Sequence, residues 1–571
     1  MAPLRGLVPT VCPQEGLFVV GELGLQQWIR RDRCLVALVA PDVSDSVGLA
    51  EAQAVPARVA HCMETVLVGW DLNRRGLWAC LLWIGGIVVA QAQPWLEPGN
   101  IFLRDDIQTL SDAGIIRGPV QVWPLAWGDI AADLDQANSV VLDEAVTGAL
   151  ARVRAKAREA QDSDYLRTDI RAAAALKPRV IRTFEDTPRE KGELELSLGW
   201  TGDRFSFKAD ATVVADASDG ESLRPDGSYL GMALGNWMVS AGYQERWWGP
   251  GWEGSQILGT NARPFPHLAI QRNHSTPFES KWLSWIGPWN LVSFIGLLDD
   301  ERVITDAQIL GLRASFRPDV PGLGGLEIGL SRTAQLCGED RPCDFDTYMN
   351  MLFGRDNRGD NVDPADEPGN QLGAIDARWA SPIGHLPYAL YFQWGAEDGR
   401  AGPSPVGSFL RQLGAEVWGN VFSTGWRHRT HLEFSETICT DGGIGGSGNQ
   451  WNCAYNHSIY QTGYRYQGRV MGNGIDGDGR SYSVGSTLQG IGGGSWQLLL
   501  RHVDINIDGG DDPAHSLSAG PNKLDELAVS HEREAFGGTL SIGAGYSRLD
   551  SPLLLGDGDG FNAFVQWKTG F

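Results

Sequence analysis

The 571-residue chain lacks three features that would place it in common functional classes. Beyond residue 92 it has no run of eighteen apolar residues, so no membrane-spanning helix is expected in that part. It has 47 basic against 70 acidic residues, a net charge of −23, and so lacks the basic surface that a nucleic-acid partner requires. Clustered histidines and Cys-x-x-Cys pairs are also missing, and we predict no metal and no other cofactor.

What the chain does have is a terminal segment, residues 561–571, with two distinct faces. Its apolar members share one parity and its polar members the other: Phe561, Ala563, Val565, Trp567 and Phe571 against Asn562, Gln566 and Lys568. This alternation is typical of a membrane-spanning β-strand with one lipid face and one wet face. The outer-membrane barrel assembly machinery also recognises a carboxy-terminal aromatic residue. We therefore predict that Trp567 and Phe571 form an assembly signal and that this machinery is a partner.

The same alternation of apolar and polar residues recurs from about Glu193 onward, at 193–207, 388–394, 426–434 and 539–547. Glycine is abundant (73 residues), and Gly/Asn/Asp-rich stretches such as 356–370 and 508–512 are typical of solvated loops. At about twenty residues per strand and connection, roughly 380 residues hold sixteen to twenty strands. The pattern predicts an all-β transmembrane barrel of antiparallel strands, with a soluble β-sandwich or propeller as the alternative.

Residues 1–92 contain the features of a signal peptide, but these features do not stand at the start of the chain. Arg74-Arg75 precede an apolar run from Leu77 to Val89, and Ala90-Gln91-Ala92 offers small residues for cleavage, as in a secretory signal peptide. A signal peptide does not function behind a long foreign segment. We therefore expect that translation starts at Met63, that 63–92 is the signal peptide, and that 1–62 is not part of the protein.

Residues 93–185 have helical rather than strand periodicity. Leu103, Ile107 and Leu110 recur at helical spacing, and Gly114 should end that helix. A short helix at 129–134 and a longer one at about 140–160 should follow. We expect a helical bundle at 93–185 and the barrel at 186–571.

Export to an oxidising compartment decides how the cysteines are interpreted. Four of the eight lie in the excluded segment, and the other four form two local pairs, Cys337 with Cys343 and Cys439 with Cys453. Local pairs in such a compartment predict disulfides that staple loops. Metal binding is the alternative, and no further ligand motif accompanies it.

Three stretches of the chain together resemble one protein family. They are Pro94-Trp95-Leu96-Glu97-Pro98-Gly99-Asn100 with Leu103-Arg104-Asp105-Asp106-Ile107; Arg246-Trp247-Trp248-Gly249-Pro250-Gly251-Trp252 with Asn261-Ala262-Arg263-Pro264; and Gly463-Tyr464-Arg465-Tyr466 with Asp476-Gly477-Asp478. Over about 94–571 the chain resembles the capsule assembly Wzi family of Gram-negative outer-membrane proteins. The Trp-Trp-Gly-Pro-Gly-Trp run is the most specific of these features.

The resemblance implies a barrel of about eighteen strands in the outer membrane, surrounded by its lipid and plugged at the periplasmic end by the helical bundle. It implies a lectin-like protein, not an enzyme, that attaches or organises capsular or extracellular polysaccharide at the cell surface. We expect a monomer. A porin or polysaccharide-export channel is the alternative. An enzyme acting on glycan is a third class, for which no triad, metal set or placed acid pair is visible.

The tryptophan-rich run supplies candidate polysaccharide contacts. Trp247, Trp248 and Trp252 can offer flat faces to sugar rings, and Arg246 and Arg263 can hold uronate carboxylates bidentately. The structural alternative is that the indoles form an aromatic girdle at a strand end and that Gly-Pro-Gly makes a tight turn.

The strand at 426–434 predicts a charge network in the lumen. Arg427, Arg429, His431 and Glu433 share one face, which should be the lumen because the apolar residues of this strand need lipid. Such charges are expected to pair with neighbouring strands or with the plug. A catalytic site is the rival, but His431-x-Glu433 is not a zinc motif, and the sequence does not give the separation of any carboxylate pair.

One further motif resembles the opening of a calcium loop, Asp504-x-Asn506-x-Asp508-Gly509. Its twelfth position is His515, where a bidentate glutamate should stand, so we predict no calcium site there.

The leader hypothesis predicts the first residue of the exported protein. Protein from purified outer membranes should begin at Gln93, or at Gln91 if cleavage follows Ala90, and amino-terminal sequencing measures this directly. Peptides from residues 1–62 in the same material would show that the start codon is correctly assigned.

Overall fold

The computed structural model describes residues 27–31, 34–38, 95–137, 144–162, 165–299, 301–353, 369–383, 386–397, 409–421, 425–441, 448–490, 492–510, 515–556 and 558–570. The predicted signal peptide, most of residues 1–62 and Phe571 lie outside them. The chain divides into two units, 1–85 and 86–571. In the first, β1 (Gln27–Arg31) pairs antiparallel with β2 (Cys34–Leu38).

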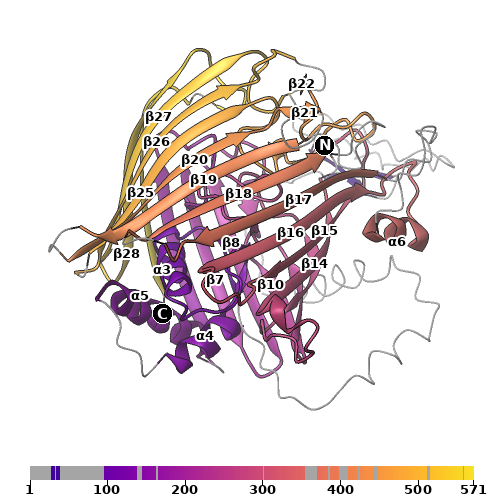
Figure 1. The fold of residues 1–571 in the computed structure, drawn as a ribbon. Coiled ribbons are helices and arrows are strands. Elements are labelled where there is room, and N and C mark those ends of the chain that lie inside the picture. Colours follow the sequence, from indigo (N-terminus) through magenta and orange to yellow (C-terminus); the bar gives the residue numbers. More distant parts are fainter. Residues whose placement is uncertain are drawn as a thin grey trace, which may run out of the picture. The chain divides into compact units, whose positions relative to one another are not determined.

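The second unit is built around a closed antiparallel β-barrel (Figure 1). Within the described residues its sheet has nineteen strands, of which β9 (Leu223–Arg224) pairs only with β8. The other eighteen close into a ring because β8 also pairs with β10, as the predicted barrel of about eighteen strands requires. In ring order they are β6 (Arg167–Ala175), β7 (Gly192–Thr201), β8 (Phe205–Ala215), β10 (Tyr229–Leu234), β11 (Trp237–Gly242), β13 (His267–Arg272), β14 (Trp289–Leu297), β15 (Gln308–Phe316), β16 (Gly325–Leu336), β17 (Gly369–Ala380), β18 (Tyr388–Glu397), β19 (Phe409–Asn420), β20 (Trp426–Glu436), β25 (Arg480–Gly490), β26 (Gly494–Ile505), β27 (Asn522–Ala535), β28 (Gly538–Leu549) and β29 (Gly560–Gly570).

The barrel begins earlier in the chain than the predicted boundary at residue 186. β6 lies in the segment assigned to the helical bundle, and it closes the ring by pairing with β7 on one side and β29 on the other. Its sequence, Arg-Thr-Asp-Ile-Arg followed by four alanines, has high intrinsic helix propensity. Two neighbouring strands with unpaired backbone groups outweigh that local preference.

Alternate residues along the strands give the barrel a polar inner face and an apolar outer face. Arg, Glu, Gln, Ser and Thr side chains of the strands are mostly buried inside, while large apolar side chains point outward and are exposed. A continuous apolar band of this kind is stable in lipid and costly in water. Members of the band include Leu196, Phe207, Leu230, Leu268, Leu330, Leu390, Leu432, Leu500, Leu527 and Val565.

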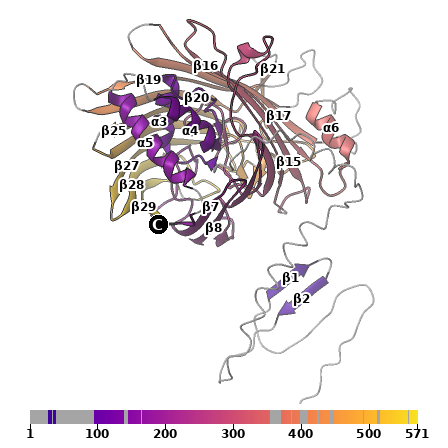
Figure 2. The ribbon, with the colours of Figure 1, turned by 90° about the horizontal axis from the view of Figure 1, so that it is seen from below.

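Three helices and three short strands precede the barrel and form what we call the plug: β3 (Trp95–Leu96), α3 (Ile101–Asp112), β4 (Val122–Trp123), β5 (Leu125–Ala126), α4 (Trp127–Gln136) and α5 (Glu144–Gln161). Asn100 caps α3 by accepting from the Leu103 N–H at 2.8 Å, and Gly114, at a φ of +72°, ends it as predicted. In the view from below, α3, α4 and α5 overlie the ring of strands (Figure 2), and Figure 1 shows α4 and α5 at its lower end. None of the described helices is both long and apolar enough to cross a membrane.

The connections between strands differ sharply at the two ends of the barrel. At the end where α5 leads into β6, which we call the plug end, most turns are short: 202–204, 235–236, 317–324, 381–387, 421–425, 491–493 and 536–537, with 273–288 as the long exception. At the opposite end, the long-loop end, the connections are 176–191, 216–228, 243–266, 298–307, 337–368, 398–408, 437–479, 506–521 and 550–559. The long connections between strands are therefore concentrated at one end of the barrel.

Both predicted disulfides are formed, and both lie at the long-loop end. Cys337–Cys343 has a Cα–Cα separation of 4.8 Å and precedes α6 (Phe345–Phe353). Cys439–Cys453 has a Cα–Cα separation of 5.9 Å and staples the loop that contains β21 (Cys439–Asp441) and β22 (Gly448–Gln450). The pairing is local in each case, as the sequence spacing predicts.

Loss of either disulfide should leave barrel assembly intact. Closing loops this short contributes about 2–3 kcal/mol in the chain-entropy model, and neither bridge joins barrel strands to the plug. Cys337→Ser/Cys343→Ser and Cys439→Ser/Cys453→Ser proteins should both remain heat-modifiable on electrophoresis. A double variant that fails to insert would contradict this separation between loop stapling and barrel formation.

Candidate functional site

Arg104 of α3 lies where the plug meets the loop of residues 243–266. This loop, which we call the inward loop, starts at the long-loop end and folds into the barrel. Its guanidinium carbon is 4.3 Å from the ring centroid of Phe184 and 4.2 Å from that of Trp252. One guanidinium nitrogen donates to the carbonyls of Pro250 at 3.0 Å and Gly251 at 2.8 Å. Burial lowers the pKa of Arg104 to about 10, so the side chain is still a cation at neutral pH. It thereby holds the Gly-Pro-Gly turn against the plug.

The inward loop is also joined to the plug through its backbone. β12 (Trp247–Trp248) pairs with β4, with Trp247 opposite Trp123. The next residue, Gly249, donates to the Gln121 carbonyl at 3.1 Å. Gly249 has a φ of +137°, and a Cβ built there would come 2.5 Å from the Gln393 amide nitrogen, so only glycine fits. The tryptophan-rich run is therefore a brace between the plug and the barrel wall.

The structure places the predicted polysaccharide contacts inside the protein. Trp247, Trp248 and Trp252 are each at most 1% exposed, and the Trp252 ring stacks on His431 with centroids 5.4 Å apart. No ring face is left for a sugar, which corrects the expectation that these indoles bind glycan. The alternative of an aromatic girdle does not describe them either, because a girdle faces lipid.

The two candidate arginines beside the brace are also engaged. Arg263 makes ion pairs of 2.8 Å with Asp219, Glu221 and Asp226, and these carboxylates raise its pKa further above the ordinary value despite burial. Arg246 is buried, with its guanidinium carbon 4.5 Å from the Phe294 ring centroid. A uronate would have to displace these partners, so neither arginine is open to an acidic sugar in this conformation.

The predicted lumen charges meet an acidic stripe on α3. Asp105 accepts from Arg427 at 2.6 Å and from Arg429 at 2.7 Å. Asp112 accepts from Arg429 at 3.0 Å and from Arg378 at 2.6 Å. Burial alone would raise the pKa of Asp105, but Arg427 and Arg429 outweigh it and hold the pKa below its usual value. The carboxylate is therefore ionised at neutral pH and locks the helix to the barrel wall.

A barrel carboxylate completes this ionic network. Glu416 of β19 accepts from Arg378 at 2.8 Å and from Arg429 at 2.7 Å, and also from the Trp252 indole at 3.1 Å. All of these groups are buried. The network thus joins the plug, three barrel strands (β17, β19 and β20) and the inward loop in one continuous set of charge-assisted hydrogen bonds.

His431 and Glu433 bind the inward loop and do not line an open catalytic site. The His431 Nε2 lies 2.8 Å from Glu253 Oε1. Glu433 accepts from the backbone N–H groups of Trp252 at 2.7 Å and Glu253 at 3.2 Å, and from the Tyr391 hydroxyl at 2.8 Å. Both acceptor oxygens of Glu433 are occupied by protein donors, so the carboxylate serves as an anchor.

The sequence predicted that these charges pair with neighbouring strands or with the plug, which is confirmed, but it did not name the plug residues, although a signal for them was present. Asp105, Thr109 and Asp112 recur at i, i+4 and i+7, which places them on one stripe of α3. Three polar groups in register on a helix that also carries a buried apolar face predict a polar partner there. Glu416 and Arg378, by contrast, share no local pattern with α3, and only the ring order of the strands brings them together.

The long-loop end presents a different group of residues around the second disulfide. Trp451, two residues before Cys453, is 40% exposed. The backbone N–H of the next residue, Asn452, donates to Asp478 at 2.7 Å, and its side-chain amide lies 3.4 Å from Asp508. Burial, with Asp508 nearby, raises the pKa of Asp478 to about 7. In the part of the chain that the structure describes, no group of three or more His, Cys, Asp or Glu side chains is placed to hold a metal ion.

A family model, described as capsule assembly protein Wzi, matches residues 161–560. The chain belongs to the Wzi family. An uncharacterised 55.8 kDa protein in the cps region of Klebsiella pneumoniae is 30% identical over 323 residues, which span 56% of this chain and 61% of that relative. The solved structure of Escherichia coli Wzi, described as a carbohydrate-binding β-barrel of the outer membrane involved in group 1 capsule assembly, aligns with a TM-score of 0.70 at 23% identity, covering 84% of this chain and 99% of that one.

Breaking the ionic network should open the barrel. Asp105→Asn leaves Arg427 and Arg429 buried with one carboxylate fewer, and breaking a buried ion pair in this way costs about 3–5 kcal/mol. The unaltered protein should be closed in planar bilayers, and the variant should show intermittent conductance as the plug loosens.

Lys156→Ala is the matched control, because it removes the exposed 2.9 Å pair with Glu159 on α5, worth less than about 1 kcal/mol. This control should stay closed. An Asp105→Asn protein as closed as the unaltered one would show that the network does not hold the plug.

Proposed function

We propose that this Wzi-family chain is an outer-membrane protein that binds and organises surface polysaccharide at its long-loop end, without catalysing a reaction on it. The apolar outer band supports a membrane location. In outer-membrane barrels the short turns face the periplasm and the long loops face outward. By that rule the plug is periplasmic and both disulfides are extracellular. A monomer, inserted by the barrel assembly machinery that reads Trp567 and Phe571, belongs to the same proposal.

The observation that carries the proposal is the occupied lumen. The plug, the inward loop and the network around Arg429 fill the barrel interior with buried, mutually bonded groups. A barrel filled in this way favours a surface function over the porin or export channel. Escherichia coli Wzi, which has the same fold, is described as carbohydrate-binding.

Trp451 is the best candidate for a sugar contact. Its exposed indole can stack on a sugar ring, and the adjoining Asn452 and the exposed Asp508 offer hydrogen-bonding groups for hydroxyls. The disulfide at Cys453 and the Asn452–Asp478 hydrogen bond restrain this segment before any ligand arrives. A restrained aromatic loses little conformational freedom on binding, which favours affinity.

Replacing Trp451 by alanine should weaken polysaccharide binding about tenfold, equivalent to about 1.4 kcal/mol. The measurement is binding of purified capsular or extracellular polysaccharide from the source organism to the detergent-solubilised protein. Trp451→Phe should retain much of the affinity, because a stacking face remains.

The control is Trp282→Ala, which removes an 87% exposed indole at the plug end. It should bind polysaccharide normally. Unchanged affinity in Trp451→Ala would move the binding surface to another loop, and failure of the unaltered protein to bind any surface glycan would overturn the proposed function.

A further inference from the structure

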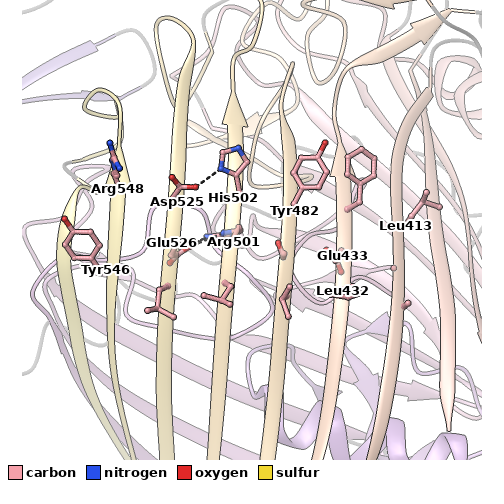
Figure 3. A pocket seen from close by; sticks show the side chains of 17 residues that line it. Leu413, Leu432, Glu433, Tyr482, Arg501, His502, Asp525, Glu526, Tyr546 and Arg548 are labelled. Carbon is pink, nitrogen blue, oxygen red and sulfur yellow. Dashed lines mark hydrogen bonds and ion pairs between the residues drawn. The ribbon is translucent and has the colours of Figure 1, made fainter. Parts of the chain in front are cut away.

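The outward face of the barrel is hollowed over β19, β20 and β25–β28, near the long-loop end. The hollow measures about 950 Å³, and Figure 3 shows the side chains that line it. Its floor and sides are outward-facing apolar and aromatic side chains, Leu413, Leu432, Tyr482, Leu500, Leu527 and Tyr546. Because this face belongs to the apolar band, the hollow opens into the lipid rather than into the lumen. It therefore offers a concave apolar surface to acyl chains.

A row of charged side chains borders the hollow on its long-loop side. In strand register His502 lies opposite Asp525, and Asp525 lies opposite Arg548. The His502 Nδ1 is 2.6 Å from an Asp525 oxygen, and Figure 3 shows Arg548 on the strand beyond them. All three point outward on strands whose next outward residues toward the plug end, Leu500, Leu527 and Tyr546, are exposed and apolar or aromatic. The row thus marks the level at which hydrocarbon gives way to headgroups.

The charged residues of this row differ in whether they have an ion-pair partner. Asp525 is paired with His502, and Asp504, one outward position further along β26, lies 3.5 Å from the Lys523 amine. Arg548 is exposed and has no hydrogen-bond or ion-pair partner among the residues described. An unpaired guanidinium at the edge of an apolar hollow is suited to a planar, bidentate contact with a phosphate.

We propose that this hollow binds a phosphorylated glycolipid of the outer leaflet, with acyl chains against Leu500 and Leu527 and a headgroup phosphate on Arg548. The unpartnered guanidinium of Arg548 favours an anionic headgroup, and the breadth of the hollow, which spans six strands, suits several acyl chains rather than one. The assignment of this lipid to the outer leaflet depends on the orientation in the proposed function, in which the long-loop end faces outward. Lipid held here would lie directly below the loops that we assign to polysaccharide.

The test uses the full-length protein in detergent with purified diphosphoryl lipid A as the probe, and native mass spectrometry counts bound lipid. Arg548→Ala should lower the apparent affinity at least tenfold, and Arg548→Lys should recover only part of it, because an ammonium lacks the planar fork. Dephosphorylated lipid A should bind the unaltered protein about as weakly as diphosphoryl lipid A binds Arg548→Ala.

Arg533 provides the matched control, since it is an exposed, outward-facing arginine at the plug end of β27. Arg533→Ala should bind lipid A normally. Equal binding by Arg548→Ala and the unaltered protein, or a loss at Arg533 instead, would overturn the proposal. Polysaccharide binding in solution should be unchanged in Arg548→Ala, so the lipid site and the glycan function can fail independently.

Discussion

An acidic stripe of α3 meets three arginines of the barrel wall, and this contact fixes where the plug sits. Asp105 and Asp112 each bond two arginines, and Arg429 is shared by both carboxylates and by Glu416. Taking so many charges out of water is costly, and the cost is offset only when every partner is in place. Such a network therefore stabilises one position of the plug and disfavours partial displacement.

Among the described residues, two surfaces outside the lumen have features suited to partners. One is the long-loop end, where the Cys439–Cys453 disulfide restrains an exposed indole, and the other is the outward face, where a hollow meets a row of charges. The first suits sugar rings and the second suits lipid. Both lie toward the long-loop end of the barrel, so the proposed polysaccharide and lipid contacts would be neighbours on one molecule.

The tryptophan-rich run shows how far local sequence can mislead about a site. Three indoles beside Gly-Pro-Gly have the composition of a sugar platform, and nothing in the run itself reveals whether it is exposed. Arg104, far away in the chain, decides the matter: its guanidinium lies against the Trp252 ring and binds the carbonyls of the turn. Trp451, an exposed indole at the long-loop end, stands alone in a glycine-rich loop and carries no motif.

The barrel, its approximate strand number, the helices before it and the two disulfides could all be predicted from the amino-acid sequence. Each of these follows from a local period or from a pair of neighbouring cysteines, and local patterns survive folding because they are what the strands and helices are made from. Tertiary structure alone decided the rest. β6 is a strand because the backbone groups of β7 and β29 pair with it on either side. Arg427 and Arg429, on the predicted lumen face, pair with carboxylates of a helix more than three hundred residues earlier in the chain. Burial of the tryptophan brace and the hollow on the outer face arise only when distant segments meet, and no periodicity within one segment encodes such a meeting.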